Sequence, residues 1–220
     1  MEHEPAGGSP ERITDFLPKG RLDAFADGVF AIAITLLVIE LPVPTGSTDL
    51  LGALYEEWPD FLGYLISFSF IGSAWISHSG LTQLMRRGDG VSFRLNLLLL
   101  LLVSLLPFST KLVAAYVREP GSETAVLVYG LNLFAASLML SLLMRFTARR
   151  PELRISGLAE GEVRSMERKR RVALAVVAAG VVVALVQPAV AMALFVVQSV
   201  LLLLLPVFAE VVRGRGAHRV

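Results

Sequence analysis

The chain has 220 residues, of which 55% are hydrophobic, with a net charge of only +1 and no cysteine. Soluble domains are typically about 45–50% apolar, and here the excess lies in long runs, so the composition predicts an integral membrane protein rather than a soluble one. The missing cysteines exclude disulfides, thiolate chemistry and cysteine-based metal sites.

Six apolar segments follow a polar N-terminus over residues 1–20, which lacks the apolar core and cleavage site of a signal peptide. Each segment has about the 20 residues that a membrane-spanning helix needs. They cover residues 22–41, 61–84, 93–112, 124–146, 172–186 and 189–212. Pro188 separates the last two, because proline lacks a backbone donor and disfavours helix at the residue before it. We therefore expect an all-α transmembrane domain over 21–212 and a short tail over 213–220.

Lysine and arginine alternate between successive loops. The N-terminus is basic, the loop over 42–60 is acidic, and the segment over 147–171 is densely basic. This alternation places both termini in the cytoplasm of a multi-pass plasma membrane protein. A basic segment can also bind nucleic acid, but the orientation rule and attraction to anionic lipid account for this one. The expected partner is therefore the lipid bilayer and not nucleic acid.

Several polar side chains should lie at one depth in the membrane. Counting 1.5 Å per residue places Asp27 about 9 Å and His78 about 12 Å inside the same cytoplasmic boundary. Arg21 and Asn96 lie near that boundary, and Trp75 shares a helix face with His78. Buried polar groups in lipid need partners. The group is either a structural staple between the first three helices, which we favour, or a proton relay or cation site.

A metal site or an enzyme is less well supported. Asp23 and Asp27 are four residues apart, but no second acidic pair lies within the membrane segments. The sequence also lacks HExxH, GxSxG and phosphate-binding glycine loops. We expect no cofactor, no metal and no enzymatic activity. No half-chain repeat is visible, so a transporter built from inverted repeats is not indicated.

One stripe of the first span recurs at helical spacing: Gly28, Ile32, Thr35 or Leu36, and Ile39. On spacing alone, this stripe indicates an ordinary packing or lipid-facing surface.

The residues at the start of the first span indicate a protein family more specifically than the spacing of its apolar residues does. Arg21-x-x-x-Phe25-Ala26-Asp27 resembles the RxxxFSD signature of the transmembrane protein 175 family. That family comprises endosomal and lysosomal potassium channels and single-repeat prokaryotic relatives. Ala26 replaces the family serine, which leaves open how the polar network is completed around Phe25 and Asp27.

The second and third spans extend the resemblance. Trp75-Ile-Ser-His78 resembles the Trp-x-x-His of the family's second helix, and Asn96 and the leucine-rich third span also fit. The resemblance implies six helices per subunit and a homotetramer, in which the first helix of each subunit lines a central pore.

The resemblance also implies where the pore narrows. The chain lacks the TVGYG filter of ordinary potassium channels. By position, Ile32 should form the main constriction, Leu36 and Ile39 further layers, with Thr35 beside them. An apolar ring can gate by dewetting. The implied function is a potassium-permeable cation channel. The alternatives are a proton-coupled secondary transporter that uses Asp27 and His78, and a membrane scaffold without transport.

Overall fold

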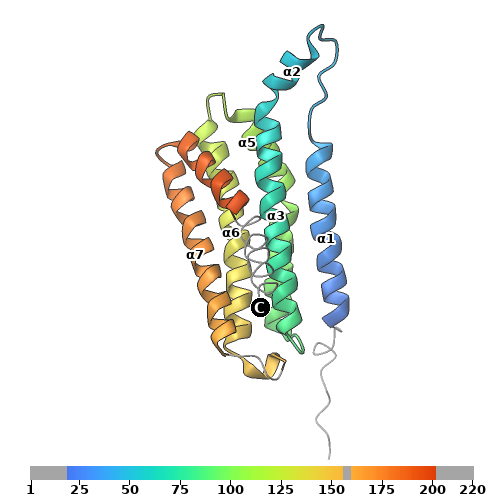
Figure 1. Ribbon diagram of the computed structural model, residues 1–220, viewed down its shortest axis with the longest axis vertical. Coiled ribbons are helices and arrows are strands. Elements are labelled where there is room, and N and C mark those ends of the chain that lie inside the picture. Colours follow the sequence, from blue (N-terminus) through green and yellow to red (C-terminus); the bar gives the residue numbers. More distant parts are fainter. Residues whose placement is uncertain (1–18, 156–159, 202–220) are drawn as a thin grey trace, which may run out of the picture.

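The chain folds into an elongated bundle of helices, seen side-on in Figure 1. The computed structural model describes residues 19–155 and 160–201. Its named helices are α1 (Lys19–Ile39), α2 (Leu50–Glu56), α3 (Trp58–Leu84), α4 (Gly90–Ser104), α5 (Leu106–Tyr116), α6 (Ser122–Ala148) and α7 (Glu160–Ala184), with a short 3-10 helix, Pro151–Leu153, between the last two. A further apolar helix covers Pro188–Leu201. Figure 1 shows α1 and α7 at opposite flanks of the bundle.

Four helical segments in the described part are long and apolar enough to cross a membrane: α1, α3, α6, and the stretch Gly90–Tyr116 that α4 and α5 share. They match the first four predicted spans. The later residues of α7 and the helix Pro188–Leu201 take the places of the fifth and sixth. The all-α integral membrane fold is thus confirmed. Residues 1–18 of the predicted N-terminus 1–20, the predicted tail 213–220 and the sixth span beyond residue 201 lie outside the described residues.

Two elements differ from the sequence prediction. The third span is divided at Leu105, because Pro107 in the first turn of α5 has no N–H to donate to the preceding turn. The basic segment 147–171 is not a continuous loop, since α7 already begins at Glu160. Arginine and glutamate are good helix formers, and Glu160 and Glu162 in the first turn suit the positive end of the helix dipole.

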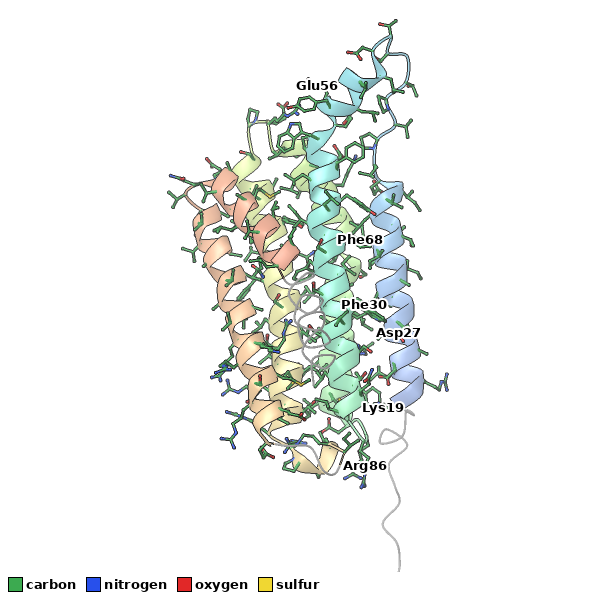
Figure 2. All side chains as sticks on the ribbon, viewed as in Figure 1. Lys19, Asp27, Phe30, Glu56, Phe68 and Arg86 are labelled. Carbon is green, nitrogen blue, oxygen red and sulfur yellow. The ribbon has the colours of Figure 1, made fainter. Side chains whose placement is uncertain are left out.

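The two ends of the bundle carry opposite charge. Lys19 and Arg86 lie at one end and Glu56 at the other (Figure 2); we name these the basic end and the acidic end. At the basic end, two backbone hydrogen bonds join the α3–α4 and α6–α7 connections: Arg86 N to Leu153 O, 2.7 Å, and Ile155 N to Leu84 O, 2.9 Å. The described segments at this end are therefore held together without a sheet.

Phe195 packs into a gap that two glycines leave between α6 and α7. A β-carbon at Gly180 would lie 2.5 Å from the Phe195 ring, and one at Gly130 would lie 2.8 Å from it. The ring is also in edge contact with Tyr129, at 6.0 Å between centroids. The last described helix thus packs on α6 and α7 through one aromatic side chain, and that side chain fits only because the two glycines have no β-carbon.

We expect Gly180→Val to destabilise the protein by about 1–3 kcal/mol, because the new side chain overpacks the Phe195 site. In a protein of this size this corresponds to a lowering of the melting temperature by about 2–4 °C per kcal/mol. Thermal unfolding in detergent measures the shift. Ala179→Val, at the neighbouring exposed position, is the control and should change the melting temperature little. Equal melting temperatures for the two variants would contradict this account of the gap.

Candidate functional site

The helix α1 packs on the bundle through one narrow stripe. Its buried residues recur every three to four positions: Ala26, Phe30, Ala33 and Leu37. This spacing keeps them on one helix face, and they join the core with residues of α3 and α4. The rest of α1 is left open, so an apolar helix in the described bundle presents most of its surface outward.

The four predicted constriction residues all lie on this open part of α1. Ile32 is 61% exposed, Leu36 41% and Ile39 72%. Thr35 is also exposed, and its hydroxyl donates to the Ile32 carbonyl oxygen at 2.9 Å. The hydroxyl oxygen keeps the capacity to accept a hydrogen bond from water or to approach a cation. Within one protomer these side chains are exposed, so any constriction they form requires other copies of the chain.

The open face of α1 is flanked by a polar contact to α3. The Trp75 indole Nε1 donates to Asp27 Oδ1 at 2.8 Å. Asp27 and Phe30 lie where α1 faces α3 (Figure 2). A carboxylate within an apolar span is costly unless a donor satisfies it, and an indole N–H directed at its oxygen supplies that donor. This bond adds a polar contact between α1 and α3 beside the buried stripe of α1.

A second polar pair joins α3 to α4. His78 Nε2 and Asn96 Oδ1 are 2.7 Å apart, and both side chains are buried. Because an amide oxygen can only accept, Nε2 carries the proton in this arrangement. The Phe30 ring lies 5.6 Å from the His78 ring, centroid to centroid. The imidazole is therefore enclosed between a polar partner on α4 and an aromatic ring on α1.

The remaining predicted members of the network lie apart from these pairs. Arg21 is exposed and forms no ion pair in the described part of the chain. Phe25 is 55% exposed. Asp23 pairs with Lys19 on its own helix, at 3.4 Å. The structure thus joins Asp27 to Trp75 rather than to Arg21 or His78. It forms two separate pairs at neighbouring positions of α3, and a functional role for the network stays a prediction.

A residue that the sequence analysis did not single out holds the other end of α1. Lys111 Nζ on α5 donates to the Glu40 carbonyl oxygen at 3.1 Å and to Asp60 Oδ1 of α3 at 2.8 Å. The signal for it in the sequence was a single lysine at the end of a span, on the side of the membrane where the loop over 42–60 carries acids and no basic residue. The pairing with Asp60, 51 positions away, depends on how the helices pack.

Known proteins are similar to this chain both in sequence and in the arrangement of their helices. A sequence model of the family described as endosomal/lysosomal potassium channel TMEM175 matches residues 21–107, which contain all but the first two residues of α1 and both polar pairs. The crystal structure of a lysosomal potassium-selective channel TMEM175 homolog from Chamaesiphon minutus is 30% identical, with a TM-score of 0.75. The match covers 84% of this chain and 95% of that one. The chain belongs to the TMEM175 family.

Curated members of the TMEM175 family carry channel names. A potassium channel of Chamaesiphon minutus is 40% identical over 133 residues, which cover 59% of this chain and 66% of that protein. An endosomal/lysosomal proton channel TMEM175 of Bos taurus is 34% identical over 134 residues, or 54% of this chain and 28% of the bovine protein. The chain thus spans less than two thirds of these relatives. Membership in the TMEM175 family makes it a membrane protein of an ion channel family rather than an enzyme.

Proposed function

We propose that four copies of this chain form a potassium-permeable channel whose pore is lined by α1 from each copy. The observation that carries this proposal is the exposure of α1. Only 22% of the residues in its most apolar stretch are buried, against 44–50% in the other three candidate spans. A central helix that contacts its counterparts in other copies requires such an open face, whereas a helix inside a monomeric bundle does not.

The choice of potassium as the permeant ion rests on the names of the relatives. The bacterial relative is named a potassium channel and the solved homolog a potassium-selective channel. We assign potassium permeation to this chain on the strength of that similarity together with the open face of α1. No cofactor is required by this function, and potassium is the permeant species rather than a resident metal.

The proposed constriction is a set of apolar rings. In a four-fold arrangement, Ile32 from each copy forms the narrowest ring, and Leu36 and Ile39 form rings towards the acidic end. Water leaves a narrow apolar ring readily, so an ion there loses its hydration without receiving ligands, which makes the ring a gate. The Thr35 hydroxyls beside these rings supply the polar contacts that favour potassium.

The proposed orientation follows from the charge of the two ends. We place the basic end, with Lys19 and Arg86, in the cytoplasm of the plasma membrane, because lysine and arginine flank cytoplasmic ends of spans. The acidic end, with Glu56, then faces outward. A protease-accessible tag placed in the loop over 42–49 would be cleaved in intact cells under this orientation and protected under the reverse one.

Reconstitution into liposomes tests the proposed function. With a potassium gradient we expect unitary current steps and a reversal potential near that of potassium, and smaller currents when sodium replaces potassium. Flux without unitary steps, driven by a pH gradient, would instead support a proton-coupled transporter that uses Asp27 and His78. Proton currents alone would match the name of the bovine relative, and the absence of any flux would match a scaffold.

A further inference from the structure

A basic cavity of about 330 Å³ lies between α6 and α7. Its lining comes from the end of α6 and the residue after it, between Leu138 and Arg149, and from the early residues of α7, between Glu160 and Leu174. Those parts of the two helices adjoin the short connection at the basic end. Figure 1 places α7 on the flank opposite to α1, so the cavity is remote from the face that we assign to the pore.

Arginine dominates the lining. Five arginines face two glutamates: the arginines are Arg145, Arg149, Arg164, Arg170 and Arg171, and the glutamates are Glu160 and Glu167. The Glu160 carboxylate is already engaged by Arg154 at 2.9 Å. Within residues 19–155 and 160–201, the lining arginines form no ion pair. The cavity therefore carries an excess of positive charge that the described side chains do not neutralise.

Arg170 is the most enclosed of these cations. Its Nε atom is buried and has no hydrogen-bond partner among the described residues. The only bond of its side chain there is a long one, 3.5 Å, from Nη1 to the Ser77 hydroxyl of α3. A buried guanidinium donor without an acceptor is costly. An anion in the cavity would supply that acceptor, and guanidinium groups suit phosphate oxygens because their donors are arranged as a planar fork.

The same cavity has an apolar side. Leu138, Leu142, Met144 and Leu174 line it together with the arginines. It therefore passes from charged groups near the basic end to apolar groups further along the two helices. A soluble anion would use only the first part. A phospholipid uses both, since its phosphate meets the arginines at the depth of the headgroups and its acyl chains meet the leucines.

We propose that this cavity binds the phosphate group of an anionic phospholipid. Arg145 of α6 and Arg149 directly after it contact the phosphate from one side, and Arg164 and Arg170 of α7 contact it from the other. Because residues of both helices contact the same phosphate, the lipid links the two helices and stabilises their packing. This site is independent of the proposed pore, so its test does not depend on channel activity.

Native mass spectrometry of the full-length protein in a nonionic detergent tests the site. The probes are dioctanoyl phosphatidylglycerol, dioctanoyl phosphatidylcholine and glycerol 3-phosphate. We expect the first to bind at lower concentration than the other two. Arg145→Gln combined with Arg164→Gln should weaken phosphatidylglycerol binding about tenfold or more, because two juxtamembrane cations are removed from the site. Both positions are exposed, so the fold should tolerate the change.

The matched control is Arg168→Gln combined with Lys169→Gln. These residues lie on the same part of α7, are exposed, and do not line the cavity. The control removes the same charge and should bind phosphatidylglycerol like the unchanged protein. Equal loss in both double variants would overturn the proposal in favour of diffuse charge attraction. Unchanged binding of phosphatidylglycerol by the cavity variant would also overturn the proposal. If glycerol 3-phosphate binds as tightly as the lipid, the ligand of the cavity is a soluble phosphate ester and not a lipid.

Arg170→Gln provides a second measurement. It should weaken phosphatidylglycerol binding and leave the elution volume of the protein in detergent unchanged. Should this variant fail to give a folded particle, the exposed double variants decide the outcome alone.

Discussion

Replacing Ile32 by asparagine should raise potassium flux and reduce the preference for potassium over sodium. The amide wets an apolar ring, so the ion keeps part of its hydration as it passes. Lowering the barrier by about 1.4 kcal/mol would raise the flux about tenfold. Ile32 is 61% exposed in the protomer, so the substitution should not disturb the packing of α1. Unitary conductance and reversal potentials in planar bilayers measure both effects.

Ile76→Asn is the matched control for this experiment. Ile76 lies on α3 and is 47% exposed, so the same chemical change is made at a similarly open position outside α1. It should leave conductance and selectivity nearly unchanged. If Ile32→Asn behaves like this control, Ile32 is not the constriction. If asparagine at Leu36 or Ile39 raises the flux instead, the constriction lies at that residue of α1.

Removing the His78 side chain should cost the protein much of its stability. His78→Ala leaves the buried Asn96 oxygen without its 2.7 Å partner and removes the ring that packs on Phe30. An orphaned buried polar group costs about 1–3 kcal/mol, and the lost side-chain volume adds to that cost. We expect a lower melting temperature and a smaller fraction of assembled particles on gel filtration.

A double replacement separates packing from proton transfer. His78→Leu with Asn96→Leu removes both polar partners, and such paired replacements can be nearly neutral for stability. We expect the double variant to recover most of the stability that His78→Ala loses and to conduct potassium. If either variant assembles normally but its flux loses its dependence on pH, the pair acts as a proton relay rather than as a structural contact.

Much of the fold could be predicted because it depends on local composition. The lengths of α1, α3 and α6 follow from apolar runs bounded by charged or turn-forming residues. The division at Leu105 was missed because the apolar run over 93–112 is long enough for one continuous helix, whereas Pro107 lies in the first turn of a separate helix, α5. The early start of α7 was missed because a run of arginines was taken as a loop, although these side chains favour helix once a bundle supports them.

The site was less accessible to prediction because depth along a helix does not fix direction around it. Counting residues placed Asp27, His78 and Asn96 at similar levels. Trp75 and His78 are three residues apart, yet the first reaches α1 and the second reaches α4. That divergence is set by how the neighbouring helices pack around α3, which a single sequence does not contain. The exposure of Ile32 likewise depends on which face of α1 the core residues occupy.

The hydrogen bonds of Lys111 have a mechanical consequence for α1. This helix is fastened near one end through Asp27 and Trp75 and at the other through the Glu40 carbonyl and Lys111. With contacts at both of these points, α1 does not tilt or slide independently of the helices that hold it. If α1 lines the pore, the diameter of the pore changes when whole protomers rotate against one another, or when the Ile32 side chain changes rotamer. A stimulus that rotates the protomers acts at the contacts between copies, and a crosslink there would hold the channel in one state, whereas a rotamer change of Ile32 would not be stopped by that crosslink.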